Sequence, residues 1–343
     1  MLELRTSLWA VAAAATSVFL VGRGACAAAV KDDLYKYDVV SAYVAQSVKG
    51  EIDTNGALAG LLRRTALETA APSASSPAVI RDSAPLSEAD RRRLDRAIPD
   101  FIEAHASPAR TGQYARWYTA ICPRIAGGLP KEFEQFLRSR VADVAESVGA
   151  RADRNPNCSP NVQVFFAAQP QKQLDELVRN EPVLLGYDFQ SQSKGAATFS
   201  GLIRPWYLTA TRGRYDDVVR DTPDSPFTAS MHQSTVSDKR SSLIWEVVVI
   251  ADGRKVAGYP VGPVADYIAM LILTKNRSGD VCGELPSILD LMVPNCRADD
   301  QPATLTEADT AFLKALYSID MNLATSLQRS HIRKLMLKEL SGG

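Results

Sequence analysis

The sequence predicts an α+β fold, with a small central sheet that contains a strand–helix–strand unit and a group of helices toward the C-terminus. Short apolar runs of strand length lie in the middle of the chain, and apolar residues at helical spacing follow from about residue 263. Beyond residue 30 the chain has four cysteines, and an even number is typical of disulfide bonds in an exported protein. We therefore expect a disulfide-stapled domain.

Residues 1–29 have the pattern of a signal peptide. Arg5 precedes an apolar run over 8–21, and small residues before position 30 offer cleavage sites. The run is shorter than the roughly 20 apolar residues that a membrane-spanning helix needs. Arg23 stands three positions before Cys26, where a lipoprotein signal has an aliphatic residue. We expect a cleaved signal, an exported protein that is periplasmic or secreted, and no transmembrane segment after cleavage.

Three segments follow the signal peptide. Residues 30–70 read as a short helical N-terminal segment, with helices over 32–48 and 57–69. Residues 71–84 are rich in Pro, Ser and Ala, a composition typical of a flexible linker. The main domain is predicted over 85–343.

The first half of the main domain contains the strand–helix–strand unit. Ser87 is the expected N-cap of a helix that runs to about Ala104, with Asp90 in its first turn. A strand over 114–122, a helix over 131–148 and a strand over 162–168 then form one crossover unit.

In the second half of the main domain, helices and strands alternate less regularly. A helix over 172–180 precedes four strand-like segments, and Asp252-Gly253 predicts a hairpin between the last two. Thr306 is the expected N-cap of the third of four C-terminal helices, with Asp309 in its first turn. The strands are expected over 197–204, 206–212, 243–251 and 255–259, and the helices over 264–274, 285–292, 307–317 and 323–340.

Four cysteines allow three pairings. We expect Cys122–Cys158 and Cys282–Cys296, because each pair is nearest in sequence and brackets a coherent unit. Zinc is the alternative, but the chain has no Cys-x-x-Cys spacing and only three histidines. We expect no metal and no cofactor.

The charge of the chain bears on its partners. It has 39 Lys and Arg and 39 Asp and Glu, so its formal net charge is zero. A balanced charge argues against nucleic acid as a partner.

Local catalytic motifs are absent from the sequence. His105, His232 and His331 lie far apart, and no His-Glu-x-x-His, phosphate-binding glycine loop or Gly-x-Ser-x-Gly occurs. The acidic segment 215–224 suggests a calcium site, but its spacing fits no calcium loop and three arginines neutralise it, which favours a surface loop.

Two pairs of adjacent aromatic residues are candidates for a binding platform. Trp206 and Tyr207 form one pair, and Trp117 and Tyr118 form the other. Because neighbouring residues of a strand point to opposite faces, core packing is the alternative for at least one ring of each pair.

The order of elements toward the C-terminus resembles that of zincin-type exported bacterial metalloproteases. The resemblance rests on a strand over 243–251, a helix over 264–273, Pro286-Ser287-Ile288-Leu289 and the helix of Leu305-Thr306-Glu307-Ala308-Asp309 through Tyr317. From about Tyr114 to Met336 the chain also resembles uncharacterised exported proteins of alphaproteobacteria. The residues that carry this second resemblance are Trp117, Cys122-Pro123, Gly128-Leu129, Cys158 and the stretch 265–270.

The zincin resemblance implies a fold without its catalytic site. Where the family has His-Glu-x-x-His, this chain has Ala265 and Ala269 at the ligand positions and Asp266 at the position of the general base. We therefore expect an exported non-catalytic protein that binds a protein, a peptide or an envelope component. The alternatives are a hydrolase with an unrecognised carboxylate site that uses Asp266 and Glu246, a degenerate metalloprotease-like protein, or a purely structural envelope factor.

Overall fold

The computed structural model describes residues 86–191, 198–213, 215–225, 240–276, 282–294, 296 and 301–342. The signal peptide, the N-terminal helical segment, the linker and His232 lie outside these residues, so the expectations for them stay predictions. Within the described ranges, no helix combines the length and apolar character that crossing a membrane requires.

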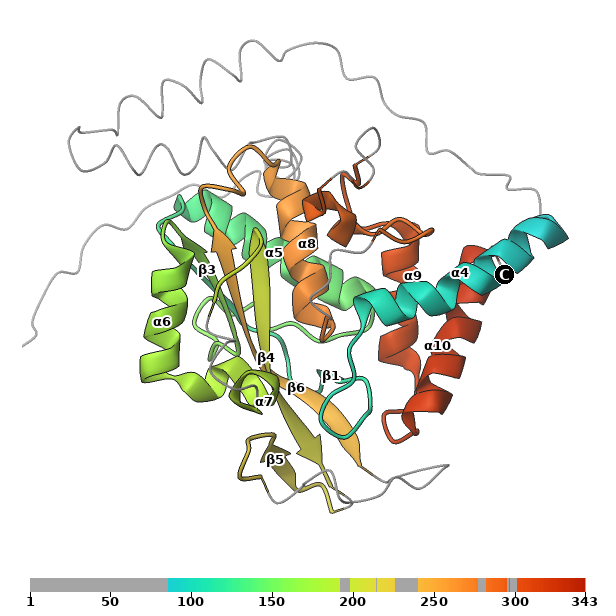
Figure 1. Cartoon of the computed structure of the whole chain (residues 1–343), viewed down its shortest axis with the longest axis horizontal. Helices are drawn as coiled ribbons and strands as arrows, with labels where there is room; N and C mark the ends of the chain where they lie inside the picture. The colour runs from blue at the N-terminus through green and yellow to red at the C-terminus, as the bar shows by residue number, and fades with distance from the viewer. Residues whose placement is uncertain are drawn as a thin grey trace, which may run out of the picture.

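A mixed sheet lies at the centre of the described structure (Figure 1). The longest strand, β6, pairs in parallel with β1 and β3 along one edge and antiparallel with β4 along the other. β2 extends the sheet beyond β3 in parallel, and β5 extends it beyond β4. The six described strands are β1 (Arg116–Trp117), β2 (Pro123–Ala126), β3 (Val162–Ala167), β4 (Ile203–Arg212), β5 (Val218–Arg220) and β6 (Ser241–Asp252).

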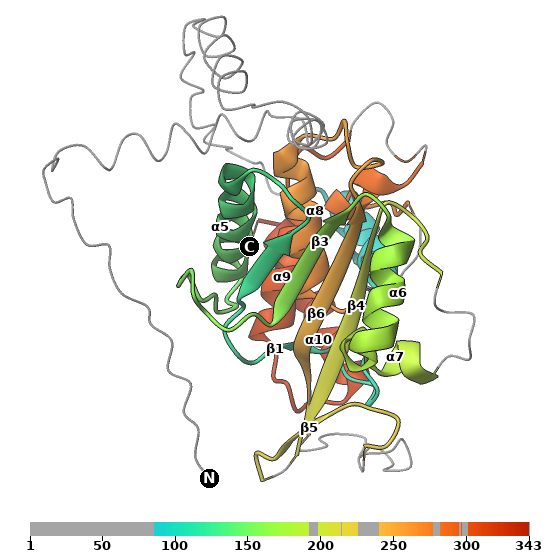
Figure 2. The ribbon, with the colours of Figure 1, turned by 90° about the vertical axis from the view of Figure 1, so that its left-hand side faces the viewer.

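Helices cover both faces of this sheet (Figure 2). One face packs against α5 (Lys131–Ser147) and α8 (Val261–Leu273), with three further helices beyond them. The opposite face packs against α6 (Pro170–Asn180), a 3₁₀ turn η1 (Pro182–Leu185) and α7 (Gly186–Ser191). The three further helices are α4 (Glu88–His105), α9 (Glu307–Ser318) and α10 (Thr325–Leu340). The predicted α+β class, with its C-terminal group of helices, is confirmed.

Strand β6 shows why the sheet is buried on both sides. Val247 and Val249 point into the larger core beneath α5 and α8. Val248 and Ile250 point the other way, into the smaller core under α6 and η1. Successive side chains of a strand alternate between faces, so a continuous apolar run suits a strand covered on both sides.

A strand–helix–strand unit is present as β2, α5 and β3, and its first strand lies after the predicted range 114–122. Gly127 follows β2 at a φ of 124°, and a Cβ there would lie 2.1 Å from the carbonyl oxygen of Phe166. Only glycine fits this close approach between the two strands. The turn leads directly into α5, which packs against β2.

The predicted strand over 114–122 is mostly wrong. Only Arg116–Trp117 pair with β6, and β2 begins after Cys122. The segment is buried for another reason, since it runs against the C-terminal helices. The backbone N–H of Tyr114 donates to Gln328, and the Arg116 guanidinium donates to the carbonyls of Leu316 and Ile319.

Three other elements differ from prediction. The expected strands over 197–204 and 206–212 are one strand, β4, which tolerates Pro205 because β5 pairs only with its residues 210–212. The hairpin at Asp252-Gly253 is wrong, because β3 and β4 already flank that end of β6 and the Asp252 carboxylate accepts the N–H of Arg254 instead. The expected helix over 285–292 is a short 3₁₀ turn, η2 (Ile288–Met292).

Both predicted disulfides are confirmed. Cys122 and Cys158 join the starts of β2 and β3, with their Cα atoms 6.1 Å apart. Cys282 and Cys296 bracket η2, with their Cα atoms 5.8 Å apart. Both distances lie in the usual range for a disulfide.

Candidate functional site

Asp266, the candidate general base, is a buried structural carboxylate. It lies in α8 with no exposed surface, and Arg140 of α5 binds both of its oxygens, at 2.5 Å and 2.9 Å. The Thr304 hydroxyl donates to it at 2.6 Å and the Leu305 N–H at 3.0 Å. These donors occupy the carboxylate and tie α8 to α5 and to the segment before α9, so Asp266 has no open approach for a substrate.

Asp266 and Glu246 do not form the carboxylate pair that a hydrolase would need. Glu246 alternates along β6 with Val248 and Ile250, which point into the smaller core, whereas α8 covers the other face of the sheet. The sheet therefore separates the two side chains. Glu246 is half-buried, and this burial raises its pKa. The nearby Arg220 lowers the pKa of Glu246, whereas the nearby Glu181 raises it.

The remaining residues of the zincin comparison do not form a site with the two histidines that the structure describes. Ala265 and Ala269 are fully buried in the larger core. His105 is also buried, with Nδ1 2.8 Å from the Phe101 carbonyl oxygen, and His331 is exposed on α10. The resemblance to zincins stays a prediction.

The aromatic pair Trp206 and Tyr207 is not exposed for binding. The two rings point to opposite faces of β4 and are 5% and 9% exposed. The Tyr207 hydroxyl donates to the Leu271 carbonyl at 2.8 Å, and burial raises the pKa of this phenol far above its ordinary value. Core packing therefore accounts for both rings. In the second pair, Trp117 is buried and Tyr118 is exposed, with the Arg212 guanidinium over its ring.

The acidic segment 215–224 does not converge on a cation. Asp221 is buried and accepts hydrogen bonds from the hydroxyls of Thr209 and Thr211, and burial raises its pKa. Asp216 is exposed and lies 3.7 Å from Arg212. The one group of described residues with metal-ligand geometry is Cys282, Asp290 and Cys296. Its two sulfurs are bonded to each other, so they are not thiolate ligands.

A groove lies beside the Cys122–Cys158 disulfide, and we call it the disulfide groove. It consists of two hollows of about 260 Å³ and 270 Å³ that share Pro123, Arg138 and Pro156. The first hollow is also lined by both cysteines, Arg124, Ile125, Glu134 and Pro160, and the second by Gln135, Ser139, Ala142, Asp153 and Arg154.

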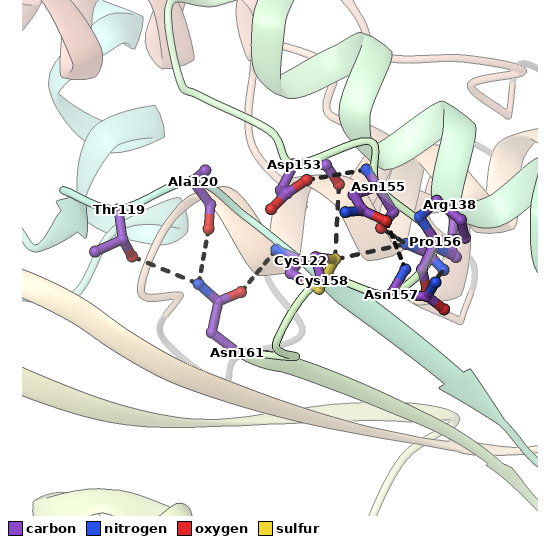
Figure 3. The surroundings of a disulfide bond; sticks show 10 residues. All are labelled: Thr119, Ala120, Cys122, Arg138, Asp153, Asn155, Pro156, Asn157, Cys158 and Asn161. Atoms are coloured by element: carbon purple, nitrogen blue, oxygen red, sulfur yellow. Dashed lines mark hydrogen bonds between the residues drawn. A yellow bond between two sulfur atoms is a disulfide. The ribbon is translucent and has the colours of Figure 1, made fainter.

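The groove has a fixed wall because the segment after α5 is anchored at several points (Figure 3). Ala152 forms a parallel bridge with Ile121. The Asn161 side chain accepts the N–H of Cys122 at 2.7 Å and donates to the Ala120 carbonyl at 2.9 Å. Side-chain turns at Asp153 and Asn155 hold the intervening loop. The disulfide is thus held from both of its ends.

Arg138 is the residue that gives this groove its chemical character. From α5 its guanidinium donates to the carbonyls of Asn155 and Pro156, at 3.0 Å and 3.2 Å, and its Nη2 lies 3.6 Å from Cys158 Sγ (Figure 3). Cys122 is only 3% exposed, whereas Cys158 is half-buried. A cation therefore lies against the more accessible sulfur.

The other charged side chains that line the groove have different partners from Arg138. Arg154 is held by Asp143 and Glu146, at 2.8 Å and 2.7 Å, and the hydrogen bond from Arg154 lowers the pKa of Glu146. Burial raises the pKa of Glu134, and Lys131 opposes this effect. Arg124 is exposed on β2. The sequence predicted the disulfide but not the groove, since no local pattern places Arg138 against a loop that begins 15 residues later.

Comparison of the chain with protein-family models, curated proteins and solved structures gives no match. The candidate site is therefore described by its own geometry. It is a groove beside a disulfide, lined by prolines and charged side chains, with the Arg138 guanidinium against one sulfur.

Proposed function

We propose that the protein is an exported, non-catalytic binding protein and that the disulfide groove holds a peptide segment of a partner protein or envelope component. The observation that carries the proposal is the continuity of the two hollows along strand β2 and helix α5. Each hollow approaches the roughly 300 Å³ at which binding clefts for small ligands begin. Together they suit a short extended segment better than a compact metabolite.

The side chains that line the groove support a peptide as the ligand. Pro123, Pro156 and Pro160 offer rigid apolar surface, which costs no side-chain ordering when a ligand binds. Arg124 offers an exposed guanidinium, a side chain that recognises carboxylates and peptide carbonyls. β2 pairs with β3 alone among the described strands, and three of its residues line the first hollow.

A hydrolase with a carboxylate site is the second candidate. The raised pKa of half-buried Glu246 favours it, because a general acid must hold its proton near neutral pH. The ion pair of Asp266 with Arg140 weighs against it, as does the position of Glu246 on the other face of the sheet. A degenerate metalloprotease-like protein would equally lack a catalytic pair, and so is compatible with the binding proposal.

A displayed library of random peptides tests the proposal on the full mature chain. We expect Gln135→Trp to abolish enrichment of peptides, because the indole would fill the second hollow from an exposed position of α5. Lys172→Trp is the matched control, since this residue is exposed on α6, on the opposite side of the sheet. Peptides that bind both variants equally, or no enriched peptides at all, would contradict the proposal.

A further inference from the structure

Two disulfides of this chain have the same accessibility pattern and opposite electrostatic surroundings. Each joins one accessible sulfur to one buried sulfur. Cys158 is half-buried and Cys122 is 3% exposed, while Cys282 is exposed and Cys296 is 1% exposed. In the first bridge the Arg138 guanidinium lies 3.6 Å from the accessible sulfur. In the second, a carboxylate oxygen of buried Asp290 lies within 4.8 Å of both sulfurs.

These charges matter because disulfides are opened by thiolates. The attacking thiolate carries a negative charge, and in the transition state this charge is shared among three sulfurs in a row. A neighbouring cation stabilises such a charge and a neighbouring carboxylate opposes it. Attack at Cys158 places the central sulfur against Arg138, whereas attack at Cys282 brings the charge toward Asp290.

We propose that the Cys122–Cys158 bridge is a thiol-exchange site, and that the partner held in the disulfide groove carries a cysteine thiol that is captured on Cys158. The inference rests on the proposed function, because the groove that holds the partner is lined by both sulfurs. It adds the chemical class of the partner, a peptide or protein with an accessible thiol. Cys282–Cys296 stays closed under the same conditions and serves as a staple.

The exchange needs no reagent beyond the partner thiol. The partner's thiolate attacks Cys158 Sγ and forms a mixed disulfide, while the Cys122–Cys158 bond breaks and its electron pair stays on Cys122. The partner sulfur is thereby oxidised and Cys122 is reduced, and Cys122 takes a proton from solvent. Release is the reverse step, in which the Cys122 thiolate attacks Cys158 Sγ and expels the partner thiolate. Asn161 positions Cys122 for this return through its bond to the Cys122 N–H.

Reduced glutathione is the probe for this inference, applied to the full mature chain. Alkylation at timed intervals and mass spectrometry of the peptides report the opening of both bridges in one molecule. We expect Cys122–Cys158 to open about tenfold faster than Cys282–Cys296, with glutathione on Cys158. In Cys122→Ser, where Cys158 is a free thiol, oxidised glutathione should place the same adduct on Cys158 and release one reduced glutathione, and the adduct should persist because no thiolate at position 122 can expel it. Equal rates, faster opening of Cys282–Cys296, or glutathione on Cys122 would overturn the inference.

Variants of two arginines separate charge from structure. We expect Arg138→Gln to slow the opening of Cys122–Cys158 severalfold, and Arg138→Lys to keep much of the rate because it keeps the positive charge. Arg179→Gln is the matched control, since Arg179 is exposed on α6, on the opposite side of the sheet and outside both hollows. An unchanged rate in Arg138→Gln, or an equal loss in Arg179→Gln, would count against a role for Arg138.

The proposed function and the thiol inference can fail separately. Library peptides without cysteine report binding in the groove alone. If such peptides bind and both bridges open at equal rates, the inference falls and the proposed function stands. If no peptide binds the groove, the proposed function falls, and the claim of a groove-bound thiol partner falls with it, whatever rate glutathione shows.

Discussion

The two disulfides of this protein close loops of different length, with sequence separations of 36 and 14, in different surroundings. Cys122–Cys158 lies at an open groove, where its loop is held by backbone carbonyls, asparagine side chains and an arginine. Cys282–Cys296 lies over η2 beside a buried acidic network, in which Ser287 caps the turn and Asp309 of α9 binds Ser287 and Ile288. One region combines its bridge with a surface that can accept a ligand, and the other combines its bridge with internal hydrogen bonds.

This difference shows that cysteine pairing alone does not assign a role. Both pairs follow the same rule in the sequence, because each cysteine bonds to its nearest neighbour. What separates them is the charge that tertiary structure brings to the sulfurs. A thiolate is stabilised beside Arg138 and opposed beside Asp290, so exchange chemistry belongs to the first bridge and stapling to the second.

The largest expected effect comes from removing each bridge in turn. In the chain-entropy description, a bridge over a sequence separation of 36 stabilises by about 4 kcal/mol and one over 14 by about 3 kcal/mol. Replacing Cys122 and Cys158 by serine should therefore lower the free energy of unfolding more than replacing Cys282 and Cys296. Urea denaturation of the two double variants measures both losses. A greater loss for the shorter loop would show that the network around η2 depends on its bridge.

A smaller effect is expected from the side chains that hold each region. Asn161→Ala leaves the Cys122 N–H without its acceptor, and Ser287→Ala removes a donor to buried Asp309, so each should cost about 1–3 kcal/mol. The two variants should differ in exchange chemistry. We expect Asn161→Ala to change the rate at which glutathione opens Cys122–Cys158, and Ser287→Ala to leave that rate unchanged. An unchanged rate in both would mean that the position of Cys122 does not depend on Asn161.

Local signals predicted much of the fold. Ser87 caps α4, and Thr306 and Asp309 form the capping box of α9, as their spacing indicates. Helix α5 and strand β3 match their predicted ranges within one residue, because their apolar periodicity is strong. The hairpin at Asp252 failed because a local turn signal says nothing about strands that already flank β6.

The candidate site could be predicted only in part. The cysteines are visible in the sequence, but the contact of Arg138 with Cys158 spans 20 residues and depends on how α5 packs against the following loop. The pairing of Asp266 with Arg140 spans 126 residues, and it turns a candidate base into a structural anchor. Burial of Trp206 and Tyr207 on opposite faces of β4 required a sheet covered on both sides.

The smallest expected effect is a difference in how pH acts on the two regions. Beside the groove, Arg154 lowers the pKa of exposed Glu146, so any stability from that pair is lost as pH falls through the folded pKa. Beside η2, burial raises the pKa of Asp309, although bonds from Ser287, Ile288 and Thr306 oppose this shift. A raised carboxyl pKa contributes stability that is complete below the unfolded pKa and is lost as pH rises through the folded pKa.

We therefore expect the stability of the native protein, relative to Asp309→Asn, to fall as pH rises from the ordinary carboxyl pKa to the raised one. The amide of the variant does not titrate, so the difference between the two urea unfolding curves isolates this carboxyl. Glu146→Gln, measured in the same way, should show a small change of opposite sign, because surface ion pairs contribute little. A relative stability that rises with pH at Asp309 would mean that the donors from Ser287, Ile288 and Thr306 outweigh burial.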